Sequence, residues 1–225
     1  MKTGLARFLS FVLHPLLIPT VLCGILFYTA PFTVANLESF NGQETIDFFG
    51  VKLSFRFGLL LLVFFFTFLI PGYLLYVLYR LRVIRSLTME RLEDRRGPYL
   101  IIVLLYTLFS FASLRYLVLL PQLTVVMASI TFSVSCVSFI SLYWQISAHA
   151  TGMGGVIGGL IALTARFGTT SLLAPLVVFI LLTGLVMSAR LQLNAHTPRQ
   201  ILAGLLLGAF ICGTTFYTFW QLDLV

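Results

Sequence analysis

The chain has 225 residues, of which 60% are hydrophobic and 9% are charged, and its formal net charge is +7. A soluble globular domain carries about 25% charged residues, so this composition excludes an ordinary soluble fold. Apolar runs long enough to cross a bilayer recur along the chain. We therefore expect an integral membrane protein, whose positive charge indicates membrane lipids or phosphorylated compounds as partners and not nucleic acid.

The N-terminal stretch MKTGLARFLSFVLHPLLIP has two early positive charges followed by a long apolar run. A removed signal peptide would end in a cleavage site made of small residues, and none closes this run. The stretch therefore predicts a first span that the protein retains.

Seven apolar segments predict an all-α fold, a polytopic transmembrane helical bundle. The third and fifth are short, so both six and seven spans are consistent with the pattern. We expect a single transmembrane domain over residues 1–225. The segments are roughly Leu9–Ala30, Phe57–Tyr79, Tyr99–Leu114, Leu123–Trp144, Ala150–Ala165, Ser171–Met187 and Ile201–Trp220.

Seven crossings would place four basic segments on one face, and that face would hold ten lysines and arginines against four on the other. The positive-inside rule then puts the ten in the cytoplasm. Without the four arginines considered below as phosphate ligands, the bias falls to six against four, which leaves the orientation open. We expect a bacterial inner-membrane protein. The smaller set is Lys52, Arg56, Arg115 and Arg166, next to an acidic loop with Glu38, Glu44 and Asp47.

Prolines interrupt two of the segments and predict kinks there, at Pro15 and Pro19 in the first and at Pro71-Gly72 in the second. His14 directly precedes Pro15 inside the first span. We expect it to make a structural hydrogen bond there.

Glycines recur at four-residue spacing in two segments, a pattern that lets helix backbones approach closely in lipid. The fifth segment contains two overlapping pairs and the last contains one, so these two helices are predicted to pack tightly together. The three cysteines lie apart within apolar runs and suggest neither a disulfide framework nor a metal site. The glycines are Gly154, Gly155, Gly158, Gly159, Gly204 and Gly208.

The stretch SARLQLNAHTPRQILAGLLLG, residues 188–208, places a histidine at the start of a helix. Thr197 suits the N-cap, Pro198 the first helical position and Gln200 the third. His196 then stands at the positive end of the helix dipole, beside Arg190 and Arg199, where an anion is favoured. His149 occupies a matching position in SAHATGMGG. We expect these two stretches to meet at one membrane surface and hold a phosphate.

Several other chemistries have no support in the sequence. No acidic pair is spaced for glycoside hydrolysis, and no His-Glu-x-x-His motif or Cys/His cluster indicates zinc. Aspartate is almost absent from the apolar segments, so a Ser-His-Asp triad is unsupported. We expect neither a metal nor another cofactor.

Three motifs appear in order between Arg91 and Gln200. Arg91-Leu92-Glu93-Asp94-Arg95-Arg96-Gly97-Pro98 keeps arginine close to a proline, and Ile146-Ser147-Ala148-His149 keeps a serine two residues before a histidine. Arg190, His196 and Gln200 have the spacing Arg, five residues, His, three residues, with Ser188 displaced by one. In this order the chain resembles the type 2 phosphatidic acid phosphatase superfamily of membrane lipid phosphatases. The resemblance implies a phosphatase-like core over roughly residues 80–220.

The resemblance also implies roles for these residues. His196 would attack phosphorus and form a phosphohistidine, while His149 would protonate the leaving oxygen and later activate water. Arginines would neutralise the phosphoryl oxygens and Ser147 would donate a hydrogen bond. The arginines are Arg190, with Arg95 or Arg96, and Arg91 from the first motif.

Gln200 is the largest departure, because the family has aspartate there. A glutamine oxygen can accept the ring N–H of the nucleophile but cannot supply a negative charge; in other triads an Asp-to-amide change costs on the order of 10⁴ in rate. The alternative is that Gln200 only completes a capping box with Thr197.

The leading functional hypothesis is a metal-independent phosphoric monoester or diphosphate hydrolase acting on a membrane lipid. The alternative is a non-catalytic membrane subunit or lipid-phosphate-binding protein that keeps the bundle. A transporter is disfavoured, because no repeat or pair of broken helices stands out in the two halves. For Arg80, Arg82 and Arg85 we favour a lipid-facing charge cluster that sets topology.

Overall fold

The computed structural model describes residues 3–37, 45–48, 51–87, 89 and 91–220. Lys2, Glu38 and Glu44, which entered the charge analysis, lie outside the described residues. In the described part, six helices are long and apolar enough to cross a membrane. They are the continuous helix Phe55–Arg80, made of α3 (Phe55–Phe64), η2 (Phe65–Leu69) and α4 (Ile70–Arg80), followed by α5 (Glu93–Tyr116), α6 (Pro121–Ile140), α7 (Ala148–Phe167), α8 (Leu173–Gln192) and α9 (Pro198–Phe219).

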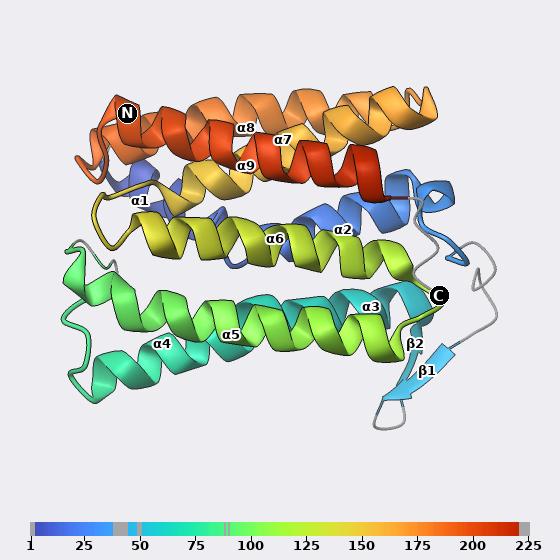
Figure 1. Ribbon diagram of the computed structural model, residues 1–225, viewed down its shortest axis with the longest axis horizontal. Helices are drawn as coiled ribbons and strands as arrows, with labels where there is room; N and C mark the ends of the chain where they lie inside the picture. Colours follow the sequence, from blue (N-terminus) through green and yellow to red (C-terminus); the bar gives the residue numbers. More distant parts are fainter. Residues whose placement is uncertain (1–2, 38–44, 49–50, 88, 90, 221–225) are drawn as a thin grey trace.

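The helices run side by side as one bundle, which confirms the predicted polytopic helical class (Figure 1). The two segments that looked short in the sequence form helices of 24 and 20 residues, α5 and α7. They are longer because polar residues at their ends, such as Glu93 and Arg166, continue the helix beyond its apolar part.

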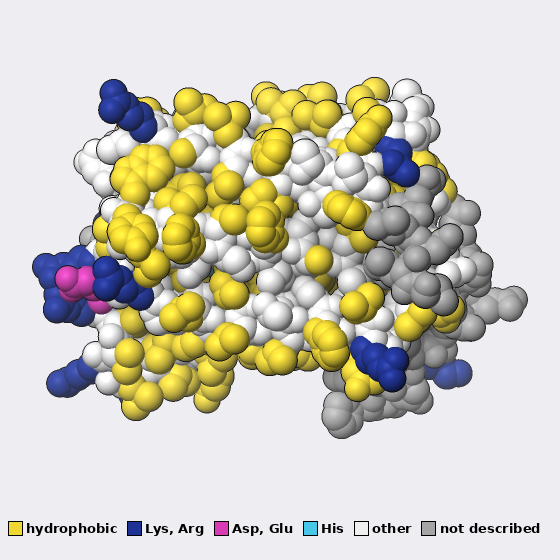
Figure 2. All heavy atoms as spheres, in the orientation of Figure 1, with side chains coloured by type: hydrophobic (Ala, Val, Ile, Leu, Met, Phe, Trp, Pro, Cys, Tyr) yellow, Lys and Arg dark blue, Asp and Glu magenta, His cyan; other side chains and the backbone are white. Residues whose placement is uncertain are grey.

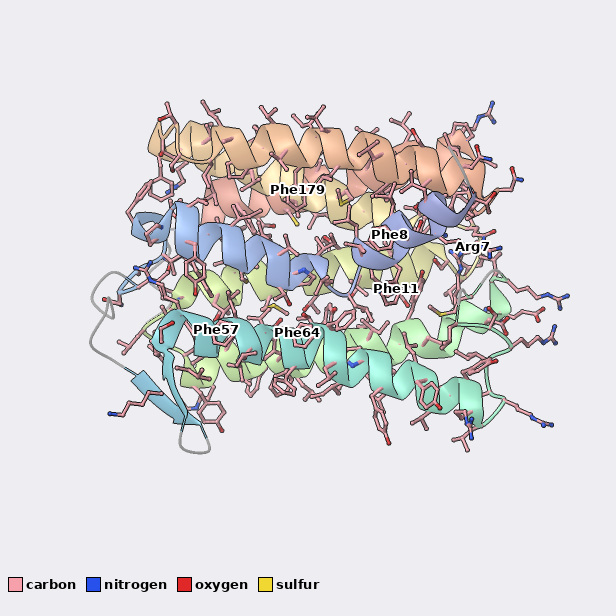
Figure 3. All side chains as sticks on the ribbon, turned by 180° about the vertical axis from the view of Figure 1, so that it is seen from behind. Arg7, Phe8, Phe11, Phe57, Phe64 and Phe179 are labelled. Carbon is pink, nitrogen blue, oxygen red and sulfur yellow. The ribbon has the colours of Figure 1, made fainter. Side chains whose placement is uncertain are left out.

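The first apolar segment forms two shorter helices, α1 (Thr3–Val12) and α2 (Ile18–Thr29), and a 3₁₀ turn η1 (Pro31–Thr33) follows. Figures 1 and 3 show α1 and α2 end to end, so that together they extend along the bundle like the longer helices. The break lies at residues 13–17, where the sequence predicts a kink at Pro15. Phe8 and Phe11 on α1 are 61% and 73% exposed, as expected of side chains that face lipid.

A two-stranded antiparallel hairpin that the sequence analysis did not predict precedes α3 in this otherwise helical fold. Strand β1 (Thr45–Phe48) pairs with β2 (Val51–Ser54), with Thr45 opposite Ser54. The hairpin falls where the sequence suggested only an acidic loop. Ser54 ends the strand and caps α3, its side chain accepting a hydrogen bond from the N–H of Phe57 at 3.4 Å.

The predicted irregularity at Pro71 takes the form of the π-helical turn η2, directly before the proline. Pro71 has no N–H to donate to the carbonyl of Thr67, four residues earlier. The hydroxyl of Tyr106 on α5 donates to that carbonyl instead, at 2.8 Å. Because Pro71 cannot donate to it, the Thr67 carbonyl is free to accept from Tyr106. This hydrogen bond links the helix Phe55–Arg80 to α5.

Helices α7 and α9 pack backbone to backbone through the glycines that the sequence singled out. A Cβ at Gly204 would lie 2.6 Å from the carbonyl oxygen of Ser147, and one at Gly208 would overlap the carbonyl of Thr151. On α7, a Cβ at Gly154 or Gly158 would overlap the α9 backbone in the same way. The predicted glycine contact is thus confirmed.

Different loops lie at the two ends of the bundle. Helix α1 begins at one end, and the loops 81–92, 141–147 and 193–197 lie at that same end (Figure 1). The hairpin and the turns α5–α6 and α7–α8 lie at the opposite end. Figure 2 shows a hydrophobic belt between the ends and basic side chains at both of them, the arrangement expected of a membrane-spanning bundle.

We predict that Gly208→Ala lowers the free energy of unfolding by about 1–3 kcal/mol, because the new methyl forces α9 away from the backbone of α7. Thermal unfolding of the purified protein in detergent measures the effect. Gly184→Ala on α8 is the matched control, since nothing lies within 4 Å of a Cβ there. Equal melting temperatures for the two variants would contradict the packing described here.

Candidate functional site

The glycine contact brings the first turns of α7 and α9 together. The N–H of Ser147 lies 3.4 Å from the carbonyl oxygen of Gln200, so the two helix starts are joined by a main-chain hydrogen bond. The predicted meeting of the two histidine-bearing stretches is therefore present in the structure. Each helix start is positive in potential, which favours an anion nearby.

Both helix starts have polar N-caps. Ser147 is fully buried, and its hydroxyl accepts a hydrogen bond from the N–H of Ala150 at 3.4 Å. At α9, Thr197 accepts from the N–H of Gln200, and the Gln200 Oε1 accepts from the N–H of Thr197 at 2.9 Å. The predicted capping box is thus confirmed.

His196 directly precedes this cap and is 8% exposed. Its Nδ1 lies 3.2 Å from the carbonyl oxygen of Gln145 in the loop before α7. A carbonyl can only accept, so Nδ1 carries the proton in this hydrogen bond, and in the neutral ring Nε2 holds the lone pair. The main chain therefore fixes the tautomer that a nucleophilic histidine needs.

The surroundings of His196 favour its neutral form. Burial is the largest cause, and the positive charges of Arg190 and Arg95 act in the same direction, so its pKa falls from 6.5 to about 4. The Gln145 carbonyl and the Gln200 side chain oppose this shift in the pKa, because both favour a protonated ring. Gln200 is therefore near the ring as well as in the cap.

His149, in the first turn of α7, is held by the broken first span. Its Nε2 lies 3.0 Å from the carbonyl oxygen of Ser10 on α1, so this nitrogen carries a proton. The ring also meets that of His14 edge to face, with the ring centroids 5.9 Å apart. The sequence analysis did not predict that α1 packs beside this site.

His14 makes the structural hydrogen bond expected of it, since its Nδ1 accepts from the N–H of Leu16 at 3.3 Å. Its position beside His149 adds a residue that the sequence analysis left out of the site. The available signal was weak, namely a histidine before a proline in an apolar run. Only the packing of α1 against α8 and α7 shows which residues it meets.

Arg190, in the last turn of α8, is the centre of the positive charge. Its guanidinium is close enough to act electrostatically on all three histidines, His14, His149 and His196. The arginine is half-buried, so these interactions are screened less than on an open surface. Arg190 therefore acts on the imidazoles at both helix starts, His149 and His196.

Arg95, at the start of α5, supplies the second charge. It is 4% exposed, and its Nε donates to the carbonyl of Met89 at 2.7 Å, while one terminal nitrogen donates to that of Ile146 at 3.3 Å. These contacts hold the side chain between two loops. A guanidinium has five N–H donors, so hydrogen bonds to these two carbonyls leave others for an anion.

The other two arginines proposed as phosphate ligands lie at the surface. Arg91 is exposed in the loop before α5. Arg96 is also exposed, and one of its terminal nitrogens donates to the carbonyl of Leu142 at 3.4 Å. Because successive helical residues point in different directions, Arg95 rather than Arg96 turns inward toward His196.

An open pocket at this end of the bundle leads to His196. It is lined by residues of the loops before α7 and α9, together with the end of α8. The start of α9 and the loop before α7 therefore border a space that solvent can enter, whereas Arg95, Arg190 and His149 are not among its lining residues. The lining residues are Gln145, Leu191, Asn194, Ala195, His196, Thr197, Pro198 and Gln200.

The donor set suits an anion better than a cation. Among the described residues, no group of three histidine, cysteine or acidic side chains is placed to hold a metal ion. Guanidinium and imidazole groups with two helix starts instead provide donors and positive potential.

No protein-family model matches this chain, and no curated protein or solved structure is significantly similar to it. The resemblance to the lipid phosphatase superfamily therefore depends on the motif residues alone.

We predict that the imidazole of His196 stays neutral down to about pH 5, because burial and two arginine charges hold its pKa near 4. The unfolded chain takes up this proton at higher pH than the folded one, so the stabilisation present above pH 6.5 is lost as pH falls toward 4. Histidine ring carbon resonances, assigned with His196→Asn, measure the titration. Arg190→Gln should raise the midpoint, whereas Arg199→Gln, at an exposed position, should leave it unchanged. A midpoint at or above pH 6.5 in the unaltered protein would disprove the electrostatic account.

Proposed function

We propose that this protein hydrolyses the phosphate or diphosphate of a membrane lipid, with His196 as the nucleophile. The observation that carries the proposal is the hydrogen bond from Nδ1 of His196 to the Gln145 carbonyl, beside Arg95 and Arg190. This hydrogen bond leaves the lone pair of the neutral ring on Nε2, and Arg95 and Arg190 place positive charge nearby. Nucleophilic catalysis at phosphorus requires such an activated, oriented nitrogen.

In the first step, Nε2 of His196 attacks phosphorus and the bond from phosphorus to the lipid oxygen breaks. His149 takes up a second proton on Nδ1 together with the anionic substrate and gives that proton to the departing oxygen, while its Nε2–H stays on the Ser10 carbonyl. In the second step, water attacks phosphorus, the phosphorus–nitrogen bond breaks and His149 takes up the proton of the water. Free phosphate leaves, and both histidines return to their initial states.

Phosphoryl transfer depends mainly on positioning and on compensation of negative charge. Arg95 and Arg190 suit the second task, because their planar donors match the phosphoryl oxygens. The two helix starts add partial positive charge in the same place. The chemistry of the site thus supplies each element of the proposed reaction from side chains and main chain.

A second candidate, favoured by the contacts of Gln200, is binding of a lipid phosphate without turnover. Its Oε1 accepts the N–H of Thr197, a contact that already explains the residue by helix capping. An amide also leaves the protonated form of His196 without a negative partner. The same pocket would then hold the lipid phosphate as a ligand, alone or as part of a larger membrane complex.

We predict that His196→Ala lowers metal-free hydrolysis of phosphatidate or of an isoprenoid diphosphate by at least about a thousandfold, since the nucleophile is removed. Released phosphate is measured with the purified chain in detergent and a chelator. Arg199→Ala is the control at an exposed basic residue on the same turn. A phosphoryl group trapped on His196 would support the route, and unchanged rates in His196→Ala would overturn it.

We also predict that Gln200→Asp raises kcat by about tenfold or more, because a carboxylate near His196 stabilises the charged ring. Gln200→Leu removes the oxygen at similar size and should lower the rate. Steady-state rates on the same lipid are compared at fixed detergent concentration. If none of the three proteins turns over the lipid while the unaltered chain binds it, the binding function is the correct one.

A further inference from the structure

Beside the candidate site, six parts of the bundle line an apolar cavity. Its walls come from the break between α1 and α2, from α2 itself and from α5, α6, α7 and α9. Towards the site its lining includes Pro15, Leu16, Tyr99 and Ala148. Towards the middle of the bundle it includes Val156 and Cys212.

The cavity extends along the helix axes. From Ala148 to Val156 there are eight residues of α7, which is about 12 Å at 1.5 Å per residue. A bilayer core is about 30 Å thick, so the cavity reaches from the site end toward the middle of the membrane. Its shape is therefore that of a slot parallel to lipid chains.

Sequence features account for this space. Pro15 ends α1, so residues 13–17 leave the inner face of the first span without a regular turn. On α7, Ala148 and Gly152 present little or no side chain to the cavity. Apolar space without an occupant is unfavourable, because the lining atoms lose dispersion contacts, and an apolar occupant restores them.

One end of the cavity is lined by residues that adjoin or contact the groups of the candidate site. Ala148 precedes His149, and Leu16 is hydrogen-bonded to His14. Tyr99 lies within electrostatic range of both Arg95 and Arg190. The apolar cavity therefore begins beside the residues around Arg95 and Arg190.

The structure assigns this cavity to one aliphatic chain of the phosphorylated lipid, with the phosphate at Arg95 and Arg190. This inference rests on the proposed function only for the position of the head group. The proposal places one linear or isoprenoid chain in this slot and leaves a second chain in the surrounding lipid. The protein should therefore prefer single-chain phosphates to tailless ones.

Two probes separate the cavity from the phosphate site, hexadecyl phosphate and inorganic phosphate. Val134 of α6 lines the cavity, and Val134→Phe fills part of it. Binding measured by calorimetry in detergent should weaken at least tenfold for hexadecyl phosphate and stay unchanged for inorganic phosphate. Val178→Phe makes the same substitution on α8, where the side chain is 52% exposed, and should change neither.

A hexadecyl phosphate with a photoreactive diazirine at its chain end tests the assignment in the unaltered protein, independently of any folding defect. Labelling should map to α7 around Val156 and to α9 around Cys212, and excess unlabelled hexadecyl phosphate should suppress it. Labelling confined to the lipid-facing side of α8 would overturn the cavity assignment. If the chain end labels the cavity but inorganic phosphate does not bind, the cavity assignment stands and the phosphate site fails.

Discussion

The close contact between the backbones of α7 and α9 is the constraint on which the candidate site depends. Without Cβ atoms at Gly204 and Gly208, the carbonyls of Ser147 and Thr151 can lie against the surface of α9. The same approach lets Ser147 and Gln200 share a main-chain hydrogen bond at the two helix starts. The histidines at those starts are thus placed by a contact made within the membrane, several residues away from them.

At this site main-chain carbonyls orient the side chains of His196, His149 and Arg95. In other sites carboxylates commonly have this role. Gln145 accepts from His196 and Ser10 lies at Nε2 of His149, while Met89 and Ile146 hold Arg95. A carbonyl dipole can fix a tautomer and a rotamer, but it contributes only partial negative charge. The site is consequently precise in geometry and positive in potential, a combination suited to an anionic ligand.

Periodicity and local chemistry were sufficient to predict the helices, the glycine contact and the capping box of Thr197 and Gln200, because each depends on residues close in sequence or on a simple spacing rule. The partners of His149 could not be predicted in this way. Ser10 and His14 are far from it in the chain, and their contact depends on where α1 packs after the break at Pro15.

The choice between Arg95 and Arg96 was open for a similar reason. Both stand near Pro98 in the sequence, and only the rotation of α5 determines that Arg95 is buried and Arg96 exposed. The hairpin at residues 45–54 was missed because its strands are four residues each, too short for alternation to be distinctive.

Among the described residues, no carboxylate acts on His196, and this has a consequence for the proposed reaction. Burial, together with the charges of Arg190 and Arg95, disfavours a proton on this ring and lowers its pKa. A bound phosphate brings negative charge and offsets the arginines, so it raises the basicity of the nitrogen that must attack it. Attack on phosphorus turns the ring into a charged phosphohistidine, and the phosphoryl oxygens then supply the opposite charge. The substrate would thus provide part of the electrostatic balance that an aspartate provides in a triad, and removal of phosphate would return His196 to its neutral form.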